Sequence, residues 1–299
     1  MRFQKFAKVK NGFIPFAAEL QFGLGPIHHH TPPNWSSAVQ SKTNLELNYK
    51  TFGQGEPIII LHGLFGTLDN WQTIARQLAE GHSVFILDQR NHGRSPHAEP
   101  HDYPTLADDL HQFMEAHWMY DGAHVIGHSM GGKTAMQFAL TYPDLVKKLV
   151  VVDIAPKAYP GNHYEIFDAL RAMDLDEISD RKAAEAVLAA RIEEEDVRLF
   201  LMKNLTRKPE GGFEFKMNLP VLWKYYPDIL AAVSGEPFEG DSLFIRGGRS
   251  KHVVLPDDEP LIKKLFPNSE IKTVADAGHW VHAEKPKELL GLVQQFLAG

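Results

Sequence analysis

Short apolar runs that alternate with helical patterns restrict the fold of this 299-residue sequence more than any other feature. Unbroken runs of this length are typical of strands that are buried on both faces of a sheet. The runs are residues 57–63, 83–88, 123–128, 149–154 and 242–248; helical patterns cover about 69–80, 104–118, 131–142 and the residues after Pro286. The order predicts an α/β fold with a doubly wound, mostly parallel sheet, whose chemistry lies at the carboxyl ends of the strands.

Two further segments complete the expected organisation. Residues 45–49 alternate apolar and polar side chains, which predicts a half-buried strand. The strand pattern stops between 157 and 241, where the composition is helical and Ser179 is the expected N-cap of one helix. We therefore expect residues 43–156 and 242–299 to form the core, 157–241 to form an inserted helical cap, and 1–42 to be an irregular N-terminal extension.

Composition and the N-terminus exclude several classes of protein. The net charge is −7 with no long run of Lys or Arg, so no nucleic-acid or membrane-surface partner is expected. No apolar stretch is long enough to span a membrane, and the absence of cysteine removes disulfides and thiol chemistry. Pro15 and Glu19 interrupt the apolar stretch near the start, which argues against a signal peptide and favours a cytoplasmic location. His28–His30 read as a polar surface segment, because consecutive residues do not all converge on one metal.

The segment VIGHSMGGKTAMQF (125–138) places Ser129 between two glycines, after an apolar run and before a helical pattern. A sharp strand-to-helix turn of this kind lifts a serine hydroxyl clear of the backbone, and Gly127 and Gly131 avoid collisions across the turn. The N-terminus of the helix also favours developing negative charge. Ser129 is therefore the predicted nucleophile, with a simple tight turn as the alternative.

A serine nucleophile needs a base, and the base needs an acid to orient it. His279 follows a glycine between a strand-like segment and the final helix, whereas His282 stands closer to that helix, so His279 is the expected base. Asp153 closes the apolar run after the Ser129 helix and is the expected acid, because a lone carboxylate there is costly to bury unpaired. The alternatives are Asp257, Asp258 and Asp276; no carboxylate occurs near Ser250, where many folds of this kind carry one.

The segment LHGLFG (61–66) ends a strand and is the expected source of an oxyanion donor. The backbone N–H groups of Leu64 and Met130 are predicted to hold the oxyanion, with Phe65 as the neighbouring alternative to Leu64. Aromatic residues predict part of an apolar substrate pocket, although such residues also form the core of caps. The pocket candidates are Phe65, Trp223 and Tyr226, with Tyr225 beside them.

Several motifs together resemble the α/β-hydrolase superfamily, and within it the small serine esterases of the bacterial YbfF type and the related ABHD11-like hydrolases. The motifs are HGLFG with LDNW, DQRNHGRSP, GHSMGGK, VVDIAP, LPVLW, FIRGG and AGHWVHAEKP, which span residues 43–299. The resemblance implies that the acid follows the strand after the nucleophile, and hence that Ser129, Asp153 and His279 form a triad. It also implies structural roles for Asp88, Arg90 and Ser95, with Asp88 as a minor alternative acid, and it implies short-chain acyl esters or thioesters as substrates.

We therefore expect a serine esterase that acts on a small-molecule ester without a cofactor or metal. A thioesterase, a carbon–carbon bond hydrolase or a perhydrolase would use the same three residues. A non-catalytic binding protein of this fold is the alternative from outside enzymes, but binding alone would not require the nucleophile, base and acid together. Dehalogenases and epoxide hydrolases of this fold use an aspartate where Ser129 stands, which argues against both.

Overall fold

The computed structural model describes residues 45–299. The expected extension of residues 1–42 and the His28–His30 run lie outside the described residues. The described chain forms one compact unit. Among these residues, no helix is both long and apolar enough to cross a membrane.

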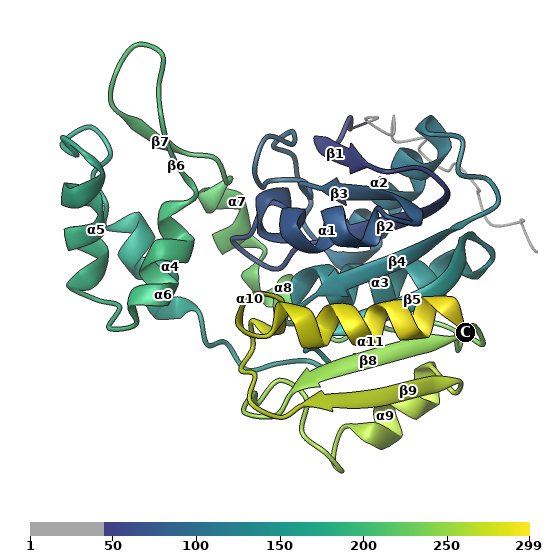
Figure 1. Cartoon of the computed structure of the whole chain (residues 1–299). Coiled ribbons are helices and arrows are strands. Elements are labelled where there is room, and N and C mark those ends of the chain that lie inside the picture. The colour runs from purple at the N-terminus through teal and green to yellow at the C-terminus, as the bar shows by residue number, and fades with distance from the viewer. Residues whose placement is uncertain (1–44) are drawn as a thin grey trace, which may run out of the picture. The chain divides into compact units, whose positions relative to one another are not determined.

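A seven-stranded sheet in the order β1-β3-β2-β4-β5-β8-β9 forms the centre of this unit (Figure 1). The strands are β1 (Tyr49–Phe52), β2 (Glu56–Leu61), β3 (His82–Leu87), β4 (Ala123–His128), β5 (Val146–Val152), β8 (Ser242–Gly247) and β9 (Ser269–Val274). Only β1 is antiparallel to its neighbour; all the other pairs are parallel. The prediction of an α/β-hydrolase-type, mostly parallel sheet is confirmed.

Helices cover both faces of the sheet, as side-chain alternation along the strands requires. The helical segments of this part are η1 (Leu68–Trp71), α1 (Gln72–Leu78), α2 (Tyr103–Ala116), α3 (Met130–Thr141), η2 (Pro143–Leu145), α9 (Glu259–Leu265), α10 (Val281–Glu284) and α11 (Pro286–Ala298). Ile58 and Ile60 of β2 enter the hydrophobic core under α1 and α11, whereas Ile59 and Leu61 enter the core under α2 and α3. Figure 1 shows α1 and α11 on one side of the sheet and α2 and α3 on the other.

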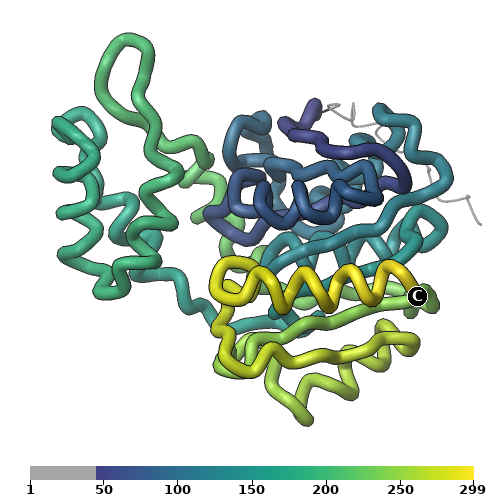
Figure 2. The backbone as a smooth tube through the Cα atoms, in the orientation of Figure 1, coloured from purple at the N-terminus to yellow at the C-terminus, as the bar shows by residue number. Residues whose placement is uncertain are grey.

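Between β5 and β8 the chain leaves the sheet and forms a group of elements that we call the cap; α4, α5, α6 and the β6–β7 pair stand apart from the sheet, and α7 and α8 lead back to it (Figure 1 and Figure 2). Its elements are α4 (Tyr164–Arg171), α5 (Arg181–Ala189), α6 (Glu195–Met202), β6 (Leu205–Arg207), β7 (Phe213–Phe215), α7 (Leu219–Lys224) and α8 (Tyr226–Leu230). Hydrogen bonds join this group to the core: Asn204 Nδ2 donates to Phe65 O at 2.7 Å, and Tyr103 OH donates to Ile229 O at 2.5 Å. We propose that the cap comprises residues 157–241, the part of the segment between β5 and β8 that contains Asn204 and Ile229.

Three details differ from the sequence-based expectations. The strand predicted at residues 45–49 begins only at Tyr49 and continues to Phe52, and this strand, β1, runs antiparallel along β3 at the edge of the sheet. The cap contains the antiparallel pair β6–β7, which was not predicted because each strand has only three residues. The N-cap of α5 is Asp180, whose carboxylate accepts from Ala183 N at 2.8 Å, so the prediction of Ser179 is wrong by one residue.

Candidate active site

Ser129 occupies the turn between β4 and α3 with φ 53° and ψ −120°, a backbone conformation that is costly for a residue with a side chain. A Cβ at Gly127 would collide with the carbonyl of Gly131, and a Cβ at Gly131 would collide with the carbonyls of Leu61 and His62. The two glycines therefore allow α3 to begin directly against the end of β2. Because the strained turn is held by this packing, the Ser129 hydroxyl is presented at the carboxyl edge of the sheet.

Leu64, Ser129 and Met130 line the same small cavity. Met130 is the first residue of α3, so its N–H has no partner within the helix. Within the described chain, the Leu64 N–H donates to no other backbone group, whereas the neighbouring Phe65 N–H donates to Nε2 of His92 at 3.3 Å. The N–H of Phe65, the alternative donor, therefore already has a partner, whereas those of Leu64 and Met130 have none among the described backbone groups.

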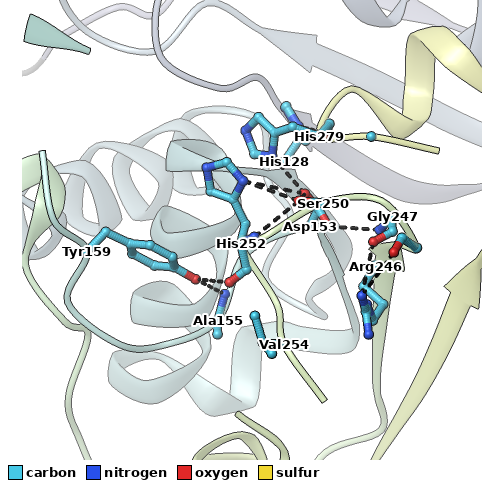
Figure 3. A network of polar contacts seen from close by, with 12 residues as sticks. His128, Asp153, Ala155, Tyr159, Arg246, Gly247, Ser250, His252, Val254 and His279 are labelled. Atoms are coloured by element: carbon cyan, nitrogen blue, oxygen red, sulfur yellow. Dashed lines mark hydrogen bonds and ion pairs between the residues drawn. The ribbon is translucent and has the colours of Figure 1, made fainter. Parts of the chain in front are cut away.

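Asp153 follows β5 with a positive φ of 51° and is only 1% exposed. Its Oδ2 lies 2.8 Å from Nδ1 of His279, and its Oδ1 accepts from Gly247 N at 2.8 Å (Figure 3). The hydroxyl of Ser250 also donates to Oδ2. Burial raises the pKa of Asp153, while the hydrogen bonds from Ser250 and Gly247 oppose that rise by stabilising the carboxylate.

The other acidic residues weighed from the sequence do not contact His279. Asp258 pairs with Lys157 at 2.7 Å and accepts from Val254 N at 2.8 Å, while Asp257 and Asp276 are exposed. Asp88 accepts from the backbone N–H of Leu68 at 2.8 Å and thereby holds the loops after β2 and β3 together. Of these carboxylates, Asp153 is the one beside the imidazole of His279.

His279 is fixed from two sides. Nε2 of His128 contacts the carbonyl of His279 at 2.9 Å, and the ring of His252 stacks on the ring of His279 at 3.7 Å between centroids. Because the Asp153 carboxylate accepts a hydrogen bond, Nδ1 of His279 carries the proton and Nε2 keeps its lone pair. Burial lowers the pKa of His279 well below its ordinary value, and the neighbouring rings of His252, His163 and His282 act in the same direction. The imidazole is therefore neutral at neutral pH and able to accept a proton.

His282, the competing base from the sequence, lies elsewhere in the same cluster. Its ring stacks on Trp71 with centroids 4.7 Å apart and planes 12° from parallel. Both His279 and His282 line the cavity that contains Ser129, but only His279 contacts a carboxylate among the described residues. This geometry favours His279.

Sequence reasoning did not identify three residues that complete this network. Ser250 occupies the position after β8 where many proteins of this fold carry the acid, and here its hydroxyl donates a hydrogen bond to the carboxylate of Asp153. His252 and His128 each contact His279, but neither lies in a motif that indicates such a role. The missing carboxylate near Ser250 could have indicated this role, because an acid that comes from another strand and is buried there needs a hydrogen-bond donor beside it.

Two cavities meet at Ser129. The first is lined by Phe65, Phe200, Trp280 and His279 among others, and the second by Tyr103, Lys133, Tyr226 and Ile229 among others. Trp223 lines neither cavity, so its predicted place in the pocket is corrected. Its ring packs edge-on against Tyr164 and Phe167 because these apolar faces of α4 and α7 bury one another.

Two groups of side chains have donor atoms close enough to hold a metal ion. In the first, Asp153, His252 and His279, the carboxylate is already bonded to Ser250, Gly247 and His279. The second comprises Glu56, His82 and His124 at the opposite edge of the sheet, where Glu56 already contacts His124 and Lys147. In each group the carboxylate oxygens already have protein partners, so neither arrangement needs a metal ion to satisfy them.

Comparisons with known proteins identify the family of this chain. Residues 56–286 match the family described as alpha/beta hydrolase fold. The chain is 39% identical over 242 residues to Esterase YbfF from Escherichia coli, covering 81% of this chain and 92% of that one. It is 38% identical over 250 residues to sn-1-specific diacylglycerol lipase ABHD11 from Mus musculus, covering 81% and 80%. A solved structure described as a marine microorganism esterase superposes with a TM-score of 0.82 at 41% identity, covering 84% of this chain and 99% of that one.

Proposed function

The chain belongs to the alpha/beta hydrolase family and is a carboxylic ester hydrolase, and from that premise we propose that it cleaves short-chain acyl esters through Ser129, His279 and Asp153. The observation that carries the proposal is the 2.8 Å contact between Nδ1 of His279 and Oδ2 of Asp153, in a cavity wall shared with Ser129. An acid, a base and a strained serine in this arrangement match what nucleophilic acyl transfer requires.

In the first step, Nε2 of His279 takes the proton of the Ser129 hydroxyl as Oγ attacks the ester carbonyl carbon. The carbonyl oxygen becomes an oxyanion, which the N–H groups of Leu64 and Met130 stabilise. His279 then gives its proton to the departing alkoxide, which leaves as the alcohol. Water, deprotonated by His279, attacks the acyl-enzyme and releases the carboxylic acid and the free Ser129 hydroxyl.

The two cavities at Ser129 fit the two halves of an ester. The leaving alcohol must receive its proton from His279, so it belongs in the cavity that His279 lines. The acyl group then belongs in the other cavity, beside Leu64 and Met130. Tyr103, Tyr226 and Ile229 are buried side chains in its wall, and it is the smaller of the two cavities, which supports a preference for short acyl chains.

The experiment is hydrolysis of p-nitrophenyl esters from acetate to laurate by the wild-type protein, Ser129→Ala and Ser234→Ala. Ser234 is an exposed serine outside both cavities, so it is the matched control. We expect wild type and Ser234→Ala to share an activity that declines with chain length, and Ser129→Ala to lose at least about 1,000-fold in kcat.

Two results would contradict parts of this proposal separately. Activity that persists in folded Ser129→Ala would remove Ser129 from the mechanism. A rate that climbs steadily toward laurate would leave the mechanism intact but reject the short-chain preference.

A further inference from the structure

A buried lysine lies one helical turn from the proposed nucleophile. Lys133 is 1% exposed, and its backbone N–H donates to Ser129 O at 3.0 Å in the first turn of α3. Ser129 and Lys133 therefore lie one turn apart at the N-terminal end of α3. Lys133 also lines the cavity that we assign to the acyl group.

The ammonium of Lys133 has polar contacts but no counter-charge. Its Nζ donates to Leu230 O at 3.2 Å and to Ala231 O at 2.5 Å, at the end of the cap. It also lies 4.8 Å from the ring centre of Tyr159 and 5.4 Å from that of Tyr103. Among the described residues, the partners of Lys133 Nζ are these carbonyl oxygens and rings, and none is a carboxylate. Burial lowers the pKa of the Lys133 side chain to about 7. A buried ammonium without an anion is costly, and a bound carboxylate would remove that cost.

The rest of the acyl cavity is suited to an anion. None of the residues that line it is acidic, and His163 and His252 lie in its wall together with Lys133. The carboxylate of Asp153 does not line this cavity and is occupied by Ser250, Gly247 and His279. An acyl chain that enters from Ser129 therefore meets no carboxylate and one buried lysine.

We propose that the acyl cavity recognises a carboxylate at the far end of a short acyl chain, and that Lys133 is the residue that binds it. The substrate class is the half-esters of short dicarboxylic acids, in which one carboxyl is esterified and the other is free. This inference rests on the proposed function, because it assigns the acyl side of the same site. It adds a specificity-determining residue and no new chemical step.

The test compares monoethyl succinate with ethyl butyrate, which has a methyl group where the succinate ester has its free carboxylate. Ethanol release gives kcat/KM for both esters with the wild-type protein, Lys133→Met and Lys148→Met. Lys148 is the matched control, because its Nζ also contacts a backbone carbonyl, Phe296 O at 2.8 Å, and a ring, that of Phe296 at 5.2 Å. It lies outside the acyl cavity.

We expect the wild-type protein and Lys148→Met to prefer monoethyl succinate, and Lys133→Met to reduce the preference by about 10-fold or more, the usual effect of a lost charge-assisted hydrogen bond. An equal loss for both esters in Lys133→Met would mean that Lys133 only tethers the cap, and would overturn the proposal. If no variant cleaves either ester, the proposed function itself fails, which is a different result.

A second measurement uses the wild-type protein alone and covers the case in which Lys133→Met does not fold. The free carboxylate stays ionised above pH 6, so a change in preference with pH reports the protein. The groups that face Lys133 are Tyr103 from α2, Tyr159 after β5, and His252 from the loop after β8, and the two tyrosines stay neutral because burial raises their pKa values. We expect the preference for monoethyl succinate to fall between pH 6 and pH 9 as the ammonium loses its proton. A preference for ethyl butyrate at every pH would overturn the proposal.

Discussion

The hydroxyl of Ser250 donates a hydrogen bond to Oδ2 of Asp153, across the gap between the end of β5 and the loop after β8. The same carboxylate oxygen lies 2.8 Å from Nδ1 of His279. Asp153 would otherwise be a buried carboxylate that only His279 and Gly247 N satisfy. Ser250 therefore stabilises the charged form of the acid from the position where the sequence lacks a carboxylate.

Replacing Asp153 should lower kcat much more than replacing Ser250, which only donates a hydrogen bond to it. In Asp153→Asn the amide oxygen can stay on Gly247 N, which turns the NH2 group toward Nδ1 of His279 and favours the wrong imidazole tautomer. We expect kcat to fall by about 10,000-fold, as for other triads in this state. Ser250→Ala leaves the carboxylate in place with Gly247 N and His279, so we expect a loss of about 10-fold or less. Steady-state kinetics on p-nitrophenyl acetate measure both. Similar losses in the two variants would contradict this division of roles.

The contact between Phe65 N and Nε2 of His92 should affect turnover, although His92 touches no substrate. His92 anchors the loop whose Leu64 N–H is a proposed oxyanion donor, because its Nδ1 contacts Arg90 O at 3.0 Å and its Nε2 accepts from Phe65 N. We expect His92→Phe to lower kcat by about 10- to 100-fold, part of the cost of losing one donor, with a smaller change in KM. His117→Phe is the control, since that ring lies at the end of α2. An unchanged kcat in folded His92→Phe would refute the positioning role.

The pH dependence of kcat/KM should have its acid limb below pH 6.5. His279 acts as a base only when neutral, and burial together with His252 keeps its pKa below that value, so activity is retained as the pH falls through 6.5. Activity ends where the coupled His279–Asp153 pair takes up a proton, and the pKa of Asp153, which burial raises, acts against a still lower limb. We expect His252→Asn to move the limb toward higher pH. A wild-type midpoint above pH 7 would contradict the environment described for His279.

The hydroxyl of Tyr226 should contribute measurably to stability. It is buried and contacts the N–H groups of Asn162 and His163 at 3.1 and 2.9 Å, and Nδ1 of His163 at 3.0 Å. Tyr226→Phe leaves these groups without an acceptor, so we expect a loss of about 1–3 kcal/mol in the free energy of unfolding.

Urea unfolding measures this effect, with Tyr225→Phe as the control. The hydroxyl of Tyr225 contacts only the exposed Glu99, at 3.1 Å, so we expect a change within about 0.5 kcal/mol. An equally small change in Tyr226→Phe would contradict the prediction and show that water can replace the Tyr226 hydroxyl as the acceptor for the N–H groups of Asn162 and His163.

Local sequence patterns were enough to predict the sheet and the turn that carries Ser129. Buried parallel strands need unbroken apolar runs, and β4 matches its predicted range of 123–128 in full. The glycines around Ser129 follow from a steric requirement that is local to the turn, so the pattern predicts the conformation without any long-range contact. Local rules were weaker for β1 and for the β6–β7 pair, where short strands depend on partners elsewhere in the chain.

The side chains that surround His279 could not be predicted from the sequence, because they come from segments that meet only in the folded protein. Ser250 and His252 lie 97 and 99 residues beyond Asp153 in the sequence, and they meet it because β5 and β8 are neighbours in the sheet. The same is true of Lys133, whose partners Leu230 and Ala231 come from the end of the cap. A hydrogen bond or a buried charge depends on distances of a few ångströms between such segments, and the packing of the sheet and cap sets those distances, whereas sequence spacing does not.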